Sequence, residues 1–198
     1  MDRTGEIEPA QRMNCLGTAT PEVDIRVAAF TVANDQISVL LDRTDGIQQL
    51  PRSVPNGVES IDQQARNLLR SHLGYPERYM EQLYTLTVVE MGVWRIVVSS
   101  VALIGSEDTP TPPARGRWLP VSELDGLSMG DEMVIEYALF RVRSKLDYTT
   151  IGFHLLSEEF TLSELQAAYE TVLGRKLDKR NFRRRMSALG ILTVTGST

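Results

Sequence analysis

Near its C-terminus the sequence contains a helix, a short link and a second helix, in the stretch "TLSELQAAYETVLGRKLDKRNFRRRMSALG". Thr161 and Glu164 have the S/T-x-x-E spacing of a capping box, and Gly174 supplies a helix stop. After the link "RKL", Asp178 can cap a second helix, which Gly190 stops. The pattern predicts two short helices joined by a tight turn, and it restricts the fold more than any other feature of the chain.

The second of these helices has two different faces. On a helical wheel Phe182, Met186 and Leu189 lie close together, which predicts a buried stripe. Five Lys or Arg occupy the seven positions 179–185 on the remaining surface. Since "ILTVTG" then alternates like a short strand, residues 147–198 predict a winged helix-turn-helix domain. Arg and Asn pair well with base edges in a major groove, and the residues predicted to contact DNA are Lys179, Arg180, Asn181, Arg183, Arg184, Arg185 and Ser187.

The positive charge is local. The whole chain has 21 Lys+Arg against 26 Asp+Glu and a net charge of -5, which excludes a general polyanion binder. Residues 148–198 contain seven cations and five acids, a net charge of +2, which leaves -7 for residues 1–147. A solvated face with salt bridges is the alternative, but only Asp178 accompanies the five cations, so most of them repel one another. A DNA partner is therefore favoured, with RNA or an acidic protein left open.

The rest of the chain mixes strands and helices. Residues 1–20 are polar and without periodicity, which predicts a flexible tail. The loops are "TDGIQQLPRSVPNG" and the proline-rich "EDTPTPPARG". Alternating or apolar runs predict strands, and helical spacing predicts helices. The predicted strands are 23–32, 37–42, 80–90 and 93–105, together with a short strand that leads into a turn within 117–124. The predicted helices are 61–73, between Ser60 and Gly74, and 131–145. An α+β domain over residues 21–146 follows.

One helix of this domain overlays a known catalytic pattern. The stretch "SVPNGVESIDQQARNLLRSHLGY" fits the Nudix box G-x5-E-x7-R-E-U-x-E-E-x-G-U without a gap, and Glu59 matches its loop acid. In a hydrolase, carboxylates on one helix face hold Mg²⁺ and activate water. Here Leu68 has no ligand atom, Ser71 is a poor ligand, and His72 is a soft nitrogen donor that we expect at the surface. We therefore predict no catalytic residue, no metal site, no cofactor and no enzyme activity.

Both parts together resemble one family, the Nudix-related transcriptional regulators of the NrtR type. The resemblance is strongest in "YTTIGFHLLSEEFTLSELQAAYETVLGRKLDKRNFRRRMSALGIL" and includes "EQLYTL" and "RWLPVSEL". It implies a Nudix-like α/β/α sandwich with a mixed sheet, followed by a winged helix-turn-helix domain. It also implies a homodimeric DNA-binding repressor whose Nudix half senses a metabolite, commonly ADP-ribose or a related nucleotide of NAD metabolism. Some members of the family instead regulate sugar catabolism. Members usually show "LPGG", whose glycines let a phosphate approach, where this chain has "LPRS".

Without magnesium, a phosphorylated effector needs cationic side chains. The predicted effector-binding residues are Arg43, Arg52, Glu59 and Arg70. Two alternatives stay open. One is a Nudix-type pyrophosphohydrolase for ADP-ribose-like substrates, with Mg²⁺ held by acids outside the box, namely Glu77, Glu81 or Glu90. The other is a protein-interaction module. No apolar run approaches the roughly 18 residues of a membrane span, and the N-terminus lacks the apolar core of a signal peptide, which predicts a cytoplasmic protein.

Overall fold

A mixed β-sheet forms the centre of the protein. The computed structural model describes residues 20–44, 46–105, 113–193 and 195. The strand order is β3-β2-β1-β6-β5, while β4 pairs with β1 and β7 pairs with β2. The pair β1–β6 is parallel and the other pairs are antiparallel, so the predicted mixed sheet is confirmed. The strands are β1 (Glu22–Ala33), β2 (Gln36–Thr44), β3 (Ile47–Gln49), β4 (Arg52–Ser53), β5 (Tyr79–Glu90), β6 (Val93–Leu103) and β7 (Arg117–Pro120).

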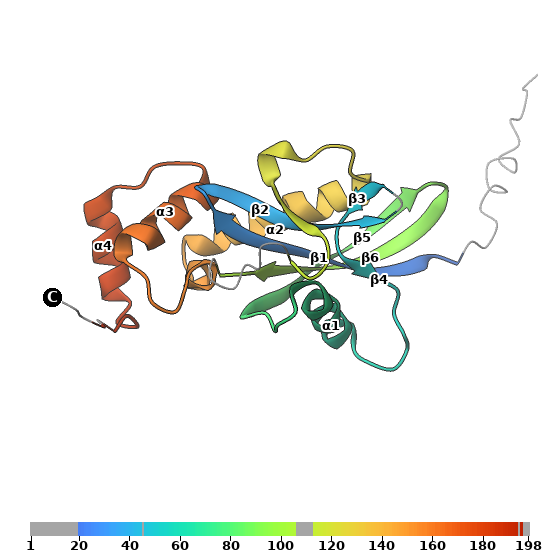
Figure 1. Cartoon of the computed structure of the whole chain (residues 1–198), viewed down its shortest axis with the longest axis horizontal. Coiled ribbons are helices and arrows are strands. Elements are labelled where there is room, and N and C mark those ends of the chain that lie inside the picture. The colour runs from blue at the N-terminus through green and yellow to red at the C-terminus, as the bar shows by residue number, and fades with distance from the viewer. Residues whose placement is uncertain (1–19, 45, 106–112, 194, 196–198) are drawn as a thin grey trace, which may run out of the picture.

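Helices cover both faces of this sheet. They are α1 (Ile61–Leu73), α2 (Met129–Leu146), α3 (Leu162–Leu173) and α4 (Lys179–Ala188), with 3₁₀ turns η2 (Val121–Glu123) and η3 (Ile151–Leu155). Along β1, Ile25 and Ala29 pack with Leu69 of α1, whereas Ala28 and Phe30 share a cluster with α2. Because successive strand residues point to opposite faces, α1 and α2 lie on opposite sides of the sheet (Figure 1). This is the predicted α/β/α sandwich.

The predicted ends of the first helix are confirmed in detail. Ser60 is the N-cap of α1, and its Oγ accepts a hydrogen bond from the Gln63 amide at 3.2 Å. Gly74 ends the helix in the left-handed conformation, with φ of 88°, and donates its amide to the Arg70 carbonyl at 2.8 Å. The β1–β2 hairpin is also confirmed. Its turn residues Asn34 and Asp35 have positive φ angles of 52° and 57°, as a tight hairpin turn requires.

Four expectations need correction or fall outside the described residues. The loop predicted over 44–57 contains β3 and β4, which are too short to show a period in the sequence and exist because β2 and β1 supply their partners. The strand predicted for "ILTVTG" is absent from residues 191–193, where no neighbouring strand pairs with the chain, and 194 and 196 are not described. The predicted tail, apart from residue 20, and positions 107–112 of the proline-rich loop also lie outside the described residues.

The C-terminal helices lie at one end of the long axis of the molecule, at the left of Figure 1. They do not have a separate core. Leu165 and Tyr169 of α3 and Met186 of α4 belong to the same buried cluster as Phe30 of β1 and Leu139 of α2. The helix α3 contacts both β1 and β2. The division at residues 146 and 147 stays a prediction, and the continuous packing means that the two parts can influence one another.

Candidate nucleic-acid interface and ligand pocket

Local hydrogen bonds fix the two helices of the C-terminal part. In α3 the Thr161 amide donates to Glu164 Oε2 at 2.7 Å and the Glu164 amide donates to Thr161 Oγ1 at 3.1 Å, so the predicted capping box is present. These bonds lower the pKa of Glu164 below its usual value. Gly174 closes α3 with a positive φ of 67°. Asp178 then caps α4, since its Oδ1 accepts from the Asn181 amide at 2.8 Å.

The inner face of α4 packs on α3. Phe182 is 5% exposed, and its ring meets Tyr169 edge to face with centroids 5.3 Å apart. Met186 is fully buried beside it. The sequence prediction was wrong for Leu189, which is 41% exposed. Leu189 is the C-cap of α4 and still has an αR backbone, and the chain turns away from the helix at Gly190, whose φ is 65°.

The outer face of α4 carries the predicted DNA-contacting residues, all of them exposed. Arg184 donates to Asn181 Oδ1 at 3.2 Å, and Arg183 reaches Ser163 Oγ at 3.5 Å, near the start of α3. Within the part of the chain that the structure describes, no acid forms an ion pair with any cation of α4. The cationic surface therefore stays uncompensated, as the sequence indicated.

Arg185 differs from the other cations of α4. Its Nη2 donates to the backbone carbonyl of Leu146, at the end of α2, at 2.6 Å. The side chain thus turns back toward the body of the protein. Nothing in the spacing of the sequence indicates this contact, because the two residues are 39 positions apart.

The Nudix-box helix carries Leu68, Ser71 and His72 at the positions of the box carboxylates. Leu68 is apolar, and Ser71 Oγ donates to the Leu68 carbonyl at 2.7 Å. His72 is only 1% exposed, so the prediction of a surface residue was wrong. It lies one turn from Leu69 on the buried face of α1, and this spacing could have been read from the sequence.

His72 is held between two acceptors. Its Nδ1 lies 2.9 Å from the Leu68 carbonyl oxygen, and its Nε2 lies 3.2 Å from Asp42 Oδ2 on β2. Burial alone would raise the pKa of Asp42, but the hydrogen bonds from His72 and from the Arg43 amide lower it below its usual value. The imidazole therefore ties α1 to the sheet.

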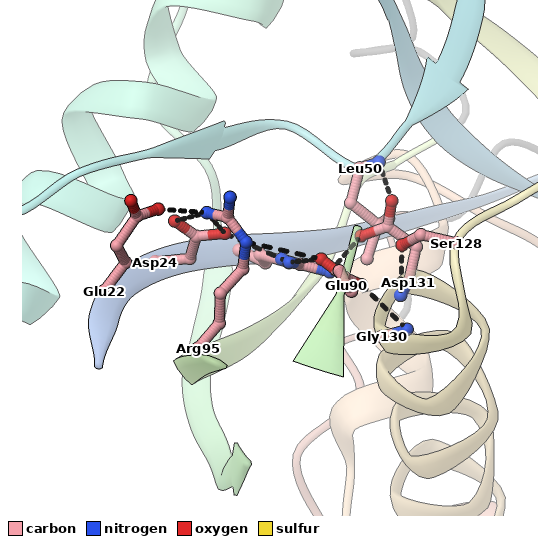
Figure 2. A network of polar contacts seen from close by, with 9 residues as sticks. Glu22, Asp24, Leu50, Glu90, Arg95, Ser128, Gly130 and Asp131 are labelled. Atoms are coloured by element: carbon pink, nitrogen blue, oxygen red, sulfur yellow. Dashed lines mark hydrogen bonds and ion pairs between the residues drawn. The ribbon is translucent and has the colours of Figure 1, made fainter. Parts of the chain in front are cut away.

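A buried charge cluster on the other face of the sheet was missed by the sequence analysis. Arg26 of β1 is fully buried, and its guanidinium contacts Asp24 at 3.0 Å, Glu90 at 2.6 Å and Asp131 at 3.0 Å. Asp24 and Arg26 alternate with apolar residues along β1 and point to the same face of the sheet as Phe30. Two charged residues on the buried face of a predicted strand were the sequence signal that could have revealed this cluster. Arg95 of β6 joins the cluster through Asp24 and Glu22 (Figure 2).

The ionisation of the cluster follows from these contacts. Burial alone would raise the pKa of Glu90, but hydrogen bonds from Arg26 and Ser128 outweigh it and lower the pKa to about 2. Burial raises the pKa of Asp131 above its usual value despite the nearby charge of Arg26. Burial acts to lower the pKa of Arg26. Glu90 and the other two acids outweigh this effect and raise the pKa above its usual value, so the guanidinium stays charged.

The N-terminal end of α2 completes this arrangement (Figure 2). Glu90 Oε1 accepts the Gly130 amide at 3.0 Å, and Asp131 Oδ2 accepts the Leu50 amide at 3.4 Å. A Cβ added at Gly130 would collide with the Glu90 carboxylate and the Arg26 guanidinium, so a side chain there would have to displace this ion pair. The carboxylates are placed against the positive end of the α2 dipole.

A pocket of about 190 Å³ lies over this cluster. Its walls come from the β2–β3 hairpin, β4, the β5–β6 turn and the start of α2, and the lining residues are Thr44, Ile47, Gln48, Gln49, Arg52, Glu90, Met91, Arg95, Ser128 and Asp131. Glu90 and Asp131 are saturated by internal donors, whereas Arg52 has no ion-pair partner among the described residues. Among the described residues that line the pocket, Arg52 is thus the cation outside any ion pair, and its charge partly offsets the burial that raises the pKa of Asp131.

The four predicted effector-binding residues do not form one site. Arg52 lines the pocket described above. Glu59 lies in a separate shallow hollow, where its Oε1 accepts from Asn67 Nδ2 at 3.0 Å. Arg43 donates to the Gly46 carbonyl at 3.3 Å at the hairpin end, and Arg70 is exposed on α1. Neither Arg43 nor Arg70 lines the pocket of Arg52.

The acids proposed for the hydrolase alternative are also scattered. Glu77 pairs with Arg66, Glu81 pairs with Lys145, and Glu90 pairs with Arg26. Among the residues that the structure describes, no group of three or more His, Cys, Asp or Glu is placed to hold a metal ion. No helix in the described ranges has the length and apolarity to cross a membrane.

Comparisons with known proteins agree with this geometry. Residues 152–198 match the family model of the NrtR DNA-binding winged helix domain. Together with the sandwich before it, the fold defines a DNA-binding transcription regulator with a Nudix-like domain. The chain is similar over 191 residues, at 27% identity, to the ADPR responsive transcriptional repressor NtrR of Acinetobacter baylyi, with 89% of this chain and 76% of that protein covered. The C-terminal domain therefore has the winged-helix type found in NrtR regulators, and the whole chain is similar to an NrtR-type repressor.

Solved structures show the same architecture. The crystal structure of Shewanella oneidensis NrtR complexed with a 27mer DNA has a TM-score of 0.81 and 27% identity, and covers 88% of this chain and 86% of that chain. The Nudix domain of the same protein, complexed with ADP ribose, has a TM-score of 0.54 at 21% identity, over 62% of this chain and 89% of that chain. The second likeness concerns the fold alone.

Proposed function

We propose that this protein is an effector-responsive transcriptional repressor, which reads DNA with α4 and binds a phosphorylated small molecule in its Nudix-like domain. The observation that carries the proposal is the uncompensated cationic face of α4 in a winged helix. Such a face costs free energy through repulsion in the free protein, and DNA phosphates remove that cost. The residues proposed to face DNA are Lys179, Arg180, Asn181, Arg183, Arg184 and Ser187.

The effector is proposed to bind in the pocket beside Arg52. A free guanidinium suits a phosphate oxygen pair, and the amides of Gln48 and Gln49 together with Thr44 suit sugar hydroxyls. Ligand pockets commonly have volumes of about 300 to 1,000 Å³. The volume of about 190 Å³ therefore fits a sugar phosphate or one part of a larger nucleotide, while the remainder would lie on the surface. The relatives named for ADP-ribose make that compound the first to test.

Binding is proposed to occur without turnover. Leu68 and Ser71 occupy box positions that require carboxylates, and His72 is engaged with Asp42. The acids outside the box are each neutralised by a cation, so recruiting one for Mg²⁺ would break an existing ion pair. The repressor would act in the cytoplasm, as the sequence predicts.

The proposal includes a homodimer formed through the N-terminal part. One recognition helix covers only a half-site, and specific operators usually require two related by a two-fold axis. The outer face of α2 supports this, because Phe140 is 65% exposed, and the Tyr137 ring lies tilted against Tyr84 of the edge strand β5 with centroids 5.3 Å apart. Arg141 lies over the Tyr84 ring at 5.2 Å. An exposed aromatic patch of this kind is typical of an interface.

The direct test is selection of DNA by the full chain. Duplexes enriched from a random library would be measured by fluorescence anisotropy with and without ADP-ribose or ribose 5-phosphate. We expect an approximate inverted repeat and an affinity that changes when one of the compounds is present. Equal binding of every sequence would contradict the proposal of a specific regulator, and release of AMP from ADP-ribose with Mg²⁺ would favour the hydrolase.

A further inference from the structure

The helix α2 connects the pocket to the DNA-reading helix. Its N-terminal end contributes Ser128 and Asp131 to the pocket wall, and its Gly130 amide donates to Glu90 at 3.0 Å. Its C-terminal end accepts the guanidinium of Arg185 from α4 on the Leu146 carbonyl at 2.6 Å. Charged groups from other elements thus hold both ends of one helix.

The physical reasons for the two contacts are complementary. The first amides of a helix lack intrahelical partners and carry partial positive charge, so a carboxylate such as Glu90 is stabilising there. The last carbonyls carry partial negative charge, so the cation of Arg185 is stabilising at the other end. Arg143 of α2 also donates its Nε to the Val172 carbonyl of α3 at 2.8 Å. Both C-terminal helices are therefore attached to the final turns of α2.

The helix between these ends is a rigid connection. It runs for 18 residues without interruption, and Val134, Ala138 and Val142 on its inner face are buried. Such a helix is about 27 Å long. Close packing does not deform gradually, so a shift at one end is carried to the other.

We infer that Arg185 is a positioning residue, which transmits occupation of the Arg52 pocket through α2 to the orientation of α4, and that it does not contact DNA. A ligand phosphate on Arg52 places negative charge beside Glu90 and Asp131, which the start of α2 holds. The shift of α2 moves the Leu146 carbonyl, and Arg185 moves α4 with it. This inference rests on the proposed function, because it needs an effector in that pocket and DNA on α4.

The test compares Arg185→Ala and Arg185→Lys with the matched control Arg184→Ala. Arg184 has the same charge and lies next in the chain, but its guanidinium contacts Asn181 and not α2. The first measurement is the salt dependence of binding to the selected duplex. Loss of a cation that neutralises a phosphate lowers the slope of log K against log salt by about one. We expect this change for Lys179→Ala, which removes the proposed phosphate contact, and no change in slope for Arg185→Ala.

The second measurement is the ratio of the DNA dissociation constants with and without ADP-ribose or ribose 5-phosphate. In the wild type a coupling of about 5- to 150-fold is typical of an allosteric pair. We expect Arg184→Ala to keep the wild-type ratio and Arg185→Ala to bring it toward one. Arg185→Lys should restore most of the ratio, because an ammonium can donate to the same carbonyl. Thermal unfolding shows whether Arg185→Ala is still folded. If it is not, the salt slope and the ratio of dissociation constants measured for Arg185→Lys test the inference.

The outcomes separate this inference from the proposed function. A wild-type ratio of one with both compounds would count against the effector role, and the salt slopes would still test the placement of Arg185. A slope lowered equally in Arg185→Ala and Lys179→Ala would overturn the inference. So would a wild-type coupling that Arg185→Ala leaves intact, whatever the effector.

Discussion

Arg26 Nη1 donates to Asp131 Oδ1 at 3.0 Å, and both side chains are fully buried. The guanidinium also contacts Asp24 and Glu90, so one buried cation lies among three acids from β1, β5 and α2. A buried ion pair is not by itself a large source of stability, because desolvation offsets much of the attraction. Removal of one partner is costly, since it leaves the others charged and buried.

We therefore expect Arg26→Met to destabilise the protein by about 3 to 5 kcal/mol. The matched control is Arg43→Met on the neighbouring strand, where the side chain is exposed and the change should stay within about 0.5 kcal/mol. Equilibrium unfolding in urea measures both variants. An Arg26→Met protein as stable as the control would show that the cluster tolerates the loss of its cation.

The second prediction concerns the pH dependence of Glu90. Its pKa is lowered from 4.5 to about 2, mainly because Arg26 and Ser128 overcome the effect of burial. A lowered carboxyl pKa stabilises the fold fully above pH 4.5, and the stabilisation is lost as the pH falls toward 2. Glu90→Gln should cost about 3 kcal/mol at pH 7. The difference from the wild type should shrink between pH 4.5 and about 2. Unfolding in urea at several pH values measures it, and a difference that is constant with pH would contradict the assignment.

Much of this fold is predictable because its signals are local. The capping residues Ser60 and Thr161, the stop at Gly74 and the β1–β2 hairpin depend on neighbours a few positions away, and the structure confirms them. The strands β3 and β4 were not predicted, because they depend on partner strands.

The candidate sites divide in the same way. The exposed cations of α4 follow from helical periodicity, which fixes the direction of each side chain. The Arg26 cluster and the contact of Arg185 with Leu146 join residues far apart in the chain, and no spacing rule encodes them. His72 was predicted wrongly although a local signal was present. Its polar imidazole suggested a surface residue, whereas its position in the helical period of α1 indicated the buried face that it occupies.

The third prediction concerns DNA recognition by α4. Arg180→Ala and Arg184→Ala should each cost about 1 to 3 kcal/mol on the selected operator and relax its sequence preference. Lys179→Ala should weaken all duplexes alike, since a lysine is suited to phosphate contact. Anisotropy titrations with operator and scrambled duplexes measure the three variants. Unchanged operator binding by the double variant Arg180→Ala, Arg184→Ala would refute the role of this helix.

The fourth prediction concerns the dimer. Phe140→Asp places a charge in the exposed aromatic patch of α2 and should dissociate the homodimer, because an unpaired charge cannot be buried in an interface. Sedimentation velocity at micromolar concentration measures the change. The control is Tyr148→Asp, which alters an exposed aromatic residue beyond the end of α2. A wild-type monomer, or a Phe140→Asp dimer, would contradict this placement of the interface.

The last prediction distinguishes the effector-binding residues and the role of metal. If the phosphate lies on Arg52, Arg52→Ala should weaken effector binding by about 1.5 to 3 kcal/mol, the value for hydrogen bonds to charged groups. Arg43→Ala and Arg70→Ala serve as controls of equal charge, since neither residue lines that pocket. Affinity should be the same in Mg²⁺ and in EDTA, because the box helix lacks the carboxylates that would hold the ion. Isothermal titration calorimetry with ADP-ribose and ribose 5-phosphate measures each case. Binding that needs Mg²⁺, or that depends on Arg70 and not on Arg52, would move the site to the Nudix-box face of the sheet.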